Sequence, residues 1–563
     1  MNLENVAGLS VENEQQLKKV ENKMSMREMI QNPIIRGFNP DPSVLRVEDD
    51  YYIVTSTFEW FPGYQIHHSR DLRNWQLVSR PLNRVSQLDM LGVPDSCGVW
   101  APCLSYHDGI FYLLFTNVRS FDGAWKDMPN YVVTTDDILG EWSDPIYLNS
   151  SGFDASFFHD EDGRTWLTNM LIDHRDNKFF GGIVLQEYNR EREELVGESH
   201  HIFAGTELGC TEGPHIYKRN GYYYLLVAEG GTGYEHAIMM ARAREITGPY
   251  ELHPENPIIS AKDNPDLYLQ KTGHGDLVQT QDGDWYAVFL ASTPTSRYGR
   301  CILGRETAIE RVEWRDDDWL YLAHGGREPR ANVEAPELPN FYFEPTPSRL
   351  DFDIPEIDIN FQSLRIPMTD DWVNQTERLG YLRLYGRESL SSTFRQSLVA
   401  RRIQAHHTEA ATCIEFEPNT FLQMAGLVYY YNTYHYHYLH LYGDDTSTKK
   451  YVGIITCDKY KQSGPFAQVD VTNVNRVYLK ADFNGYDLQF YFATEAGNWH
   501  KIGPVLDGSI LSDDYVEDIA VRYRPCFTGA FVGLCCQDLL GRNLHADFDW
   551  FEYRELAYYR KES

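Results

Sequence analysis

One structural unit recurs five times between residues 41 and 292, and this repeat constrains the fold more than any other feature. Each copy is an apolar strand, a polar turn and a second strand rich in aromatic residues, which is typical of a β-hairpin. The turns are Asp49-Asp50, Asp108-Gly109, Asp162-Gly163, Asn220-Gly221 and Asp282-Gly283. The copies are spaced by 59, 54, 58 and 62 residues, enough for a four-stranded blade with long loops. The repeat therefore predicts an all-β chain with a five-bladed β-propeller.

Alignment of the copies on their turns places five different residues at one equivalent position. Eight residues before each turn stand Asp41, Trp100, Asp154, Glu212 and His274. Taken singly, an Asp at a strand start is an ordinary turn residue, and a lone His or Trp is ordinarily packing. Because the first strand of every blade lines the propeller axis, the five side chains should instead converge. A structural repeat would keep one residue type, so we interpret this convergence as a functional site.

Three carboxylates at one point are suited to glycoside hydrolysis. Cleavage of a glycosidic bond requires a protonated acid for the leaving oxygen and an ionised carboxylate for water or for the anomeric carbon. A third carboxylate raises the pKa of its neighbour through like-charge repulsion. The competing use, a hydrolytic metal site, lacks an H-E-x-x-H motif or a comparable ligand spacing.

Seven ordered motifs carry a family resemblance that runs from about residue 31 to the end of the chain. They are NPIIRGFNPDPS around Asp41, STFEWFPG around Phe58, GVWAP around Trp100, GFDASFF around Asp154, TEGPH around Glu212, GHGDLV around His274 and LGRET around Arg305. With these motifs the chain resembles glycoside hydrolase family 43, and most closely its two-domain β-xylosidases. The resemblance implies a propeller followed by a concanavalin-like β-sandwich, and hydrolysis with inversion of anomeric configuration.

The resemblance also implies roles for individual residues. It makes Asp41 the general base, Glu212 the general acid, and Asp154 the residue that sets the pKa and orientation of that acid. Phe58 and Trp100 would form walls of the sugar subsite, Arg305 would donate to sugar hydroxyls, and Thr232 would be a secondary contact. Phe527, in RPCFTGAF, is the candidate for a loop that the second domain sends over the pocket.

Three of these residues keep an alternative interpretation. Thr232 lies in a Gly-rich loop, Arg305 could form an ion pair with Glu306 or Asp276, and Phe527 could be a core aromatic. The chain departs from the resemblance at Ile172, where many xylosidases of this type would have an aromatic residue, and this departure would alter subsite affinity. Members of the family bind calcium near the propeller axis, with His274 as the matching residue here, although no cofactor is expected to be required.

Domain limits follow from composition. Residues 1–30 form an N-terminal extension without an assigned role, residues 31–340 the catalytic propeller and residues 341–563 the C-terminal sandwich. Prolines at 329, 336, 339, 345 and 347 indicate an extended connector between the two domains. In the second domain, His435, His437 and His440 alternate between strand faces in a way that favours structural histidines over a metal site.

Net charge and cysteine content limit the classes of partner and the cellular compartment that we expect. The 51 basic against 82 acidic residues give a net charge of −31, which argues against nucleic acid and anionic membranes as partners. Nine irregularly spaced cysteines and the lack of an apolar signal segment predict reduced thiols and a cytoplasmic protein. The sequence is compatible with a homo-oligomer but carries no signal for the oligomeric state.

The sequence thus predicts an exo-acting β-1,4-xylosidase that releases xylose from the non-reducing ends of xylo-oligosaccharides. An α-L-arabinofuranosidase, or an enzyme with both activities, is the alternative, since the resemblance covers both. A sugar-binding propeller without catalysis is the alternative of another class, and the retention of all three acidic residues argues against it.

Overall fold

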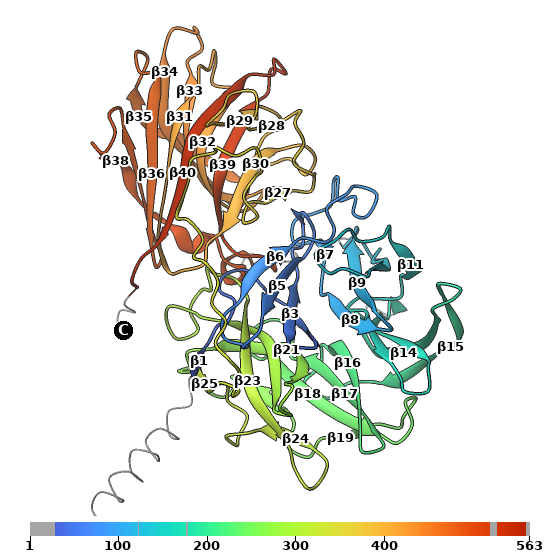
Figure 1. The fold of residues 1–563 in the computed structure, drawn as a ribbon. Coiled ribbons are helices and arrows are strands. Elements are labelled where there is room, and N and C mark those ends of the chain that lie inside the picture. The colour runs from blue at the N-terminus through green and yellow to red at the C-terminus, as the bar shows by residue number, and fades with distance from the viewer. Residues whose placement is uncertain (1–28, 122, 176–177, 518–525, 559–563) are drawn as a thin grey trace, which may run out of the picture.

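The computed structural model describes residues 29–121, 123–175, 178–517 and 526–558, and within them it consists almost entirely of β-strands. Two bodies are visible in Figure 1: a propeller, coloured blue to yellow-green, and a sandwich, coloured orange to red. The extension predicted for residues 1–30 lies outside the described residues except for its last two.

Five antiparallel sheets form the propeller and confirm the predicted number of blades. The first blade contains β2 Ser43–Val47, β3 Asp50–Thr55, β5 Gln65–Ser69 and β6 Gln76–Ser79, and the second contains β8 Cys103–His107, β9 Ile110–Val118, β10 Asn130–Thr135 and β11 Ile146–Asn149, with β7 Gly98–Val99 beside β9. The third contains β12 Ser156–His159, β13 Thr165–Ile172, β14 Phe180–Asn189 and β15 Glu194–Phe203, and the fourth contains β16 Glu212–Arg219, β17 Tyr222–Glu229, β18 Ala237–Ala243 and β19 Glu251–Leu252, with β20 Ile259–Ser260 beside β18. The fifth contains β21 Gln270–Gln279, β22 Trp285–Ser292, β23 Glu306–Trp314 and β24 Leu320–Leu322.

The first strands of the blades form a closed ring around the axis. Strand β2 contacts β8, β8 contacts β12, β12 contacts β16, β16 contacts β21, and β21 returns to β2. Each of these strands pairs with the next strand of its blade across a turn predicted from the repeat, as Val47 opposite Asp50 and His107 opposite Ile110 illustrate. The hairpin pattern in the sequence therefore places the starts of five strands around one axis.

Two packed sheets form the sandwich. The larger sheet contains β28 Val373–Asn374, β29 Leu382–Tyr385, β40 His545–Glu555, β31 His407–Glu415, β36 Arg476–Asn484, β37 Asp487–Ala493 and β38 His500–Asp507, with β26 Arg349–Leu350 beside β40. The smaller contains β30 Ser397–Arg402, β39 Phe531–Asp538, β32 Gln423–Asn432, β33 His435–Gly443, β34 Lys450–Asp458 and β35 Lys461–Asp470. Within the described part of the sandwich, the helical elements are the 3₁₀ turn η2 Gly508–Ile510 and the helix α2 Asp513–Glu517. The three histidines of β33 are buried and bond to protein groups. His435 contacts Asn432, His437 contacts Thr456 and the Asp507 carbonyl, and His440 contacts the Tyr438 carbonyl.

The two bodies share a short strand pairing and a common core. Strand β4 (Trp60–Phe61) of the propeller pairs with β27 (Ser363–Leu364) of the sandwich, whereas β1 (Met29–Gln31) and β25 (Asn332–Glu334) pair with each other on the propeller side. The Trp60 ring stacks on the Phe531 ring of the sandwich with centroids 3.7 Å apart. Because this stack belongs to one apolar cluster that contains residues of both bodies, the sandwich is packed firmly against the blade that carries Asp41.

In the described residues, the cysteines are all free and, except for Cys210, buried. No helix among the described residues is long and apolar enough to cross a membrane.

Candidate active site

One pocket at the propeller axis collects side chains from all five blades and from the sandwich. The five residues aligned from the repeat all line it, together with both predicted aromatic walls and the other predicted substrate contacts. Its lining is Asp41, Phe58, Trp100, Ala101, Phe153, Asp154, Glu212, Thr232, His274, Arg305 and Phe527. The structure thus brings together all nine residues singled out from the sequence.

Unusual backbone conformations aim several of these side chains into the pocket. Asp41, Phe58, Asp154 and His274 have φ angles of 54°, 52°, 56° and 42°, in the left-handed region that non-glycine residues seldom adopt. Asp41 and Asp154 stand two residues before the first strand of their blades, β2 and β12. Strained conformations of this kind cluster at functional sites, where the surrounding structure holds them in place.

Close packing between blades fixes Glu212. It begins β16 at an irregularity of the ladder, and the next residue, Gly213, has a φ of 58°. A Cβ atom at Gly213 would lie 3.0 Å from the His274 ring, so glycine is needed for the two blades to approach. The Gly213 N–H donates to Asp154 Oδ2 at 3.0 Å. That bond ties the Asp154 carboxyl group to the backbone beside Glu212.

Arg305 is held against Asp41. Its Nη1 donates to Asp41 Oδ1 at 3.0 Å, and Ser56 Oγ donates to Asp41 Oδ2 at 2.7 Å. The alternative pairing of Arg305 with Glu306 or Asp276 is wrong, because Glu306 accepts from Gly37 and Thr293, and Asp276 accepts from Ser43 and Tyr217. The ion pair and the hydroxyl stabilise a negative charge on Asp41.

The other two carboxyl groups, those of Asp154 and Glu212, have raised pKa values. Burial, reinforced by the charge of Asp41, raises the pKa of Asp154 from 3.8 to about 8. Burial, with Asp154 and Asp41 as neighbours, raises the pKa of Glu212 well above its ordinary value, and Arg305 offsets only part of the rise. Burial also lowers the pKa of His274 to about 4, so its imidazole is neutral near pH 7. The pocket therefore places one carboxylate stabilised by an ion pair beside two carboxyl groups whose pKa values are raised.

Aromatic rings line the pocket beside the carboxyl groups. Phe58 and Trp100 lie with ring centroids 6.2 Å apart, and Phe527 lies 5.8 Å from Phe58 and 5.4 Å from Trp100. The Phe527 carbonyl also accepts a bond of 3.1 Å from Arg305 Nη2. Phe527 is therefore a pocket residue supplied by the sandwich and not only a core aromatic.

Sequence reasoning missed three residues at the site. Ala101 and Phe153 line the pocket, and Ser56 bonds to Asp41. Two of them adjoin predicted residues, since Ala101 follows Trp100 and Phe153 precedes Asp154, so inspection of the flanking positions could have found them. Ser56 ends the same repeat unit that begins with Asp41, without a distinguishing signal of its own.

Ile172 lies outside the lining of this pocket. Its side chain is buried, and its N–H donates to the Ser151 carbonyl at 2.9 Å. Aromatic rings nevertheless continue outward from the pocket wall. Phe121 lies 6.0 Å from Trp100, and Phe179 lies 5.8 Å from Phe121.

The surroundings of His274 do not assemble a metal-ligand set. Calcium takes six to eight oxygen ligands. Around His274 Nδ1 lie Asp41 Oδ1 at 3.8 Å, already paired with Arg305, and Asp154 Oδ2 at 4.0 Å. Among the described residues, no three His, Cys, Asp or Glu side chains form a metal-binding group. The calcium role of His274 stays a prediction from the resemblance.

Three buried carboxyl groups and an aromatic-walled pocket on a propeller axis define a glycoside hydrolase. The model of glycosyl hydrolases family 43 matches residues 30–320, and that of the β-xylosidase C-terminal concanavalin A-like domain matches residues 349–554. The chain belongs to glycoside hydrolase family 43 and carries the two-domain architecture of its β-xylosidases.

Curated relatives cover nearly the whole chain. A protein named β-xylosidase from Bacillus subtilis (strain 168) is 49% identical over 93% of this chain and 99% of its own length. A protein named xylosidase/arabinosidase 43B from Humicola insolens is 50% identical over 94% of this chain and 98% of its own. A crystal structure of xylan β-1,4-xylosidase from Bacillus halodurans C-125 aligns with a TM-score of 0.90 at 51% identity, covering 93% of this chain and 100% of the other.

Proposed function

We propose that this enzyme is an exo-acting β-1,4-xylosidase that releases xylose from the non-reducing ends of xylo-oligosaccharides with inversion of configuration. The observation that carries the proposal is the division of the pocket between a carboxylate held by an ion pair and a carboxyl group of raised pKa. Arg305 and Ser56 stabilise a negative Asp41, while burial and like charges raise the pKa of Glu212. Cleavage with a general base and a general acid needs this combination.

The reaction follows from that division. Asp41 takes a proton from a water molecule, whose oxygen forms a bond to the anomeric carbon of the terminal sugar. The bond from that carbon to the leaving oxygen breaks, and Glu212 gives its proton to that oxygen. Each sugar leaves with a complete set of hydroxyls, and the two carboxyl groups have exchanged protonation states. Attack from the face opposite the leaving group inverts the anomeric centre.

Asp154 acts on Glu212 through charge and through the backbone. Its negative charge is among the causes that raise the pKa of Glu212. Its bond from the Gly213 N–H also fixes the distance between the two residues. Once it is ionised, Asp154 therefore helps the general acid to keep its proton, without taking part in bond cleavage.

The position of Phe527 supports action on chain ends. This ring, from the sandwich, lies 5.4 Å from Trp100 and covers one side of the pocket. A pocket walled from a second domain suits a terminal sugar better than the middle of a polymer. The β-1,4 linkage is supported by the name of the Bacillus halodurans structure, and the substrate by the names of the relatives.

Substitution of the general acid tests the proposal. Glu212→Gln should lower kcat on xylobiose by about 10²- to 10⁴-fold, because the amide cannot protonate the leaving oxygen. With an aryl xyloside whose phenol is a good leaving group, the loss should be much smaller. Equal losses on both substrates, or an undiminished rate on xylobiose, would remove Glu212 from this role.

An α-L-arabinofuranosidase activity is the second candidate, favoured by the name of the Humicola insolens relative. The two sugars present similar hydroxyl patterns to the same pocket. The ratio of kcat/KM for matched aryl β-xyloside and aryl α-L-arabinofuranoside separates the candidates. We expect the xyloside to be preferred, and a preference for the arabinofuranoside would reverse the assignment.

A further inference from the structure

Ser96 lies where the propeller, the sandwich and two walls of the pocket meet. It is fully buried, two residues before β7. Its hydroxyl accepts from the Phe527 N–H at 3.0 Å, and its carbonyl accepts from Trp100 Nε1 at 3.1 Å. Its own N–H donates to Glu59 Oε2 at 3.0 Å. A single residue outside the pocket lining thus bonds to two pocket walls, one from each body of the protein.

The sandwich holds the segment around Ser96 in place. Arg365 Nη2 donates to Asp95 Oδ1 at 2.7 Å, and Arg365 Nε donates to the Val93 carbonyl at 2.6 Å. Thr433, also from the sandwich, donates to Asp95 Oδ2 at 2.5 Å. Arg365 and Asp95 are largely buried, so this cross-boundary pair fixes the residue adjacent to Ser96.

The backbone conformation at position 96 does not explain why the residue is a serine. Its φ of 54° lies in the left-handed region, which glycine adopts more readily than any residue with a Cβ atom. The side chain supplies the one contact that glycine would lose, the acceptor for the Phe527 amide. This contact places the Phe527 ring beside Trp100 and Phe58.

We propose that Ser96 is a positioning residue: its hydroxyl holds Phe527 against Trp100, so that the seating of the sandwich on the propeller sets the affinity of the pocket for the terminal sugar. The inference rests on the proposed function for the identity of that sugar. It extends the site to a residue that touches neither the sugar nor the reacting atoms.

A double-mutant cycle on Ser96→Gly and Phe527→Ala tests the proposal through binding. Gly removes the hydroxyl and accepts the left-handed backbone, so the variant should fold; Ser96→Ala is the second variant, free of added backbone flexibility. Loss of one hydrogen bond should weaken the Kd for D-xylose by about 5-fold and raise KM for xylobiose equally. The kcat and its pH profile should stay within about 2-fold, because no carboxyl group is altered.

In the Phe527→Ala background the Ser96 substitutions should change Kd by less than about 2-fold, since the ring they position is absent. Ser69→Ala is the matched control. Ser69 is also fully buried and accepts from the amides of Asp71 and Leu72 at 3.2 and 3.0 Å, away from the pocket lining, so its removal should leave Kd unchanged.

An unchanged Kd in Ser96→Gly, or an equal change with and without the Phe527 ring, would overturn the positioning role. A wild-type enzyme that binds xylose but does not cleave xylobiose would contradict the proposed function instead. The Kd cycle would still decide the role of Ser96 in that case.

Discussion

Asp154 in the propeller and Asp547 in the sandwich are almost equally buried, with exposed fractions of 7% and 5%, but their pKa values move in opposite directions. Burial raises the pKa of Asp154 to about 8, and neighbouring Asp41 adds to the rise. Burial would also raise the pKa of Asp547, but hydrogen bonds from Arg383 and Arg378 outweigh it and lower the pKa. At similar exposure, the pKa of a buried carboxyl group thus depends on whether neighbouring cations offset the effect of burial.

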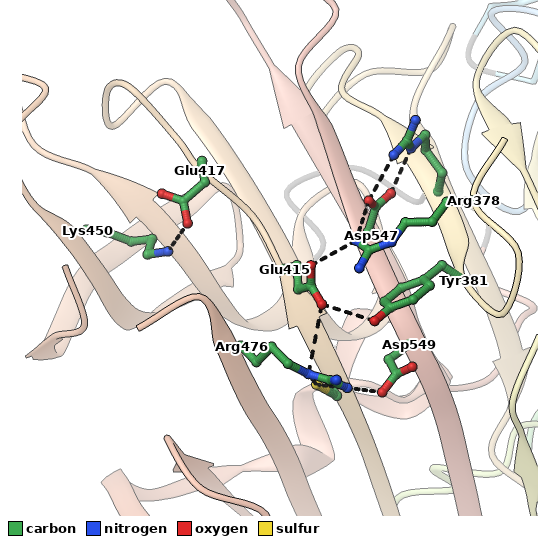
Figure 2. Close-up of polar contacts among 10 residues, drawn as sticks. Arg378, Tyr381, Glu415, Glu417, Lys450, Arg476, Asp547 and Asp549 are labelled. Carbon is green, nitrogen blue, oxygen red and sulfur yellow. Dashed lines mark hydrogen bonds and ion pairs between the residues drawn. The ribbon is translucent and has the colours of Figure 1, made fainter. Parts of the chain in front are cut away.

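Figure 2 shows the sandwich cluster in which Asp547 lies. Arg383 holds it in a fork, with Nε at 2.7 Å and Nη2 at 2.9 Å, and Arg378 joins it to Glu415. Arg476 pairs with Asp549 and Glu415. Three carboxylates thus share three guanidinium groups, whereas the three carboxyl groups that line the pocket share that of Arg305 alone. The sandwich cluster is suited to stability and the pocket to proton transfer.

The largest expected effect is a loss of catalytic rate when the propeller carboxylate Asp41 is replaced. Asp41→Asn should lower kcat on xylobiose by about 10²- to 10⁴-fold, because the amide cannot take a proton from water. Asp49→Asn, on the exposed turn of the same hairpin, is the control and should retain full activity. Steady-state kinetics of both variants is the measurement, and an active Asp41→Asn enzyme would rule out this residue as the base.

The next largest effect is a loss of stability when the ion-pair cluster of the sandwich is disrupted. Arg383→Met should lower the free energy of unfolding by about 3 kcal/mol at pH 7, because Asp547 stays buried with fewer donors. Since its folded pKa is lowered, the paired Asp547 stabilises the fold above its ordinary value of 3.8, and this contribution is lost as pH falls through the folded value.

Urea unfolding of the wild type and Arg383→Met, at pH 7 and at a series of pH values falling below 3.8, measures this difference. The two proteins should converge as pH falls through the lowered pKa of Asp547, while kcat at pH 7 stays unchanged. A stability gap that does not depend on pH would show that Arg383 acts through packing alone.

A smaller shift sharpens the contrast at Asp154. Asp154→Asn should move the alkaline limb of the kcat profile to lower pH, because Glu212 loses a neighbouring negative charge and its pKa falls. The pH dependence of the stability that Asp154 contributes is opposite in sign to that of Asp547. The folded pKa is raised, so the protonated Asp154 contributes stability below 3.8 that is lost as pH rises to about 8.

Thermal unfolding checks the second half of this prediction. Relative to the wild type, Asp154→Asn should gain stability between pH 4 and pH 8. An alkaline limb at its original pH, measured on xylobiose, would contradict the action of Asp154 on the general acid.

The smallest expected effect lies at the edge of the sandwich cluster. Glu417 accepts from Lys450 Nζ at 2.5 Å, but its side chain is 71% exposed. Glu417→Gln should change the free energy of unfolding by less than about 1 kcal/mol, since solvent screens such pairs. A loss as large as that of Arg383→Met would mean that exposure does not separate the two pairs.

The propeller and its axis residues were predictable because the repeat encodes them locally. Five hairpins in register identify the strand starts, and ring closure brings Asp41, Trp100, Asp154, Glu212 and His274 together without further information. The predicted fold class and number of blades are confirmed.

Contacts across the domain boundary were less predictable. Phe527 reaches the pocket from a position more than 480 residues after Asp41, and its place depends on Ser96 and on the seating of the sandwich. The pairing of Arg305 with Asp41, in place of Glu306 or Asp276, likewise depends on packing between distant segments. Strand periodicity carries no signal for such long-range contacts.

Proton NMR of the enzyme with xylobiose tests the central claim, that a stabilised Asp41 carboxylate and a protonated Glu212 hydrolyse a xyloside by direct attack of water. Spectra recorded before mutarotation report which anomer of xylose is released first. We predict α-xylose, the product of a single inversion. Early β-xylose would contradict the proposed mechanism, since retention requires a covalent intermediate on a carboxylate nucleophile.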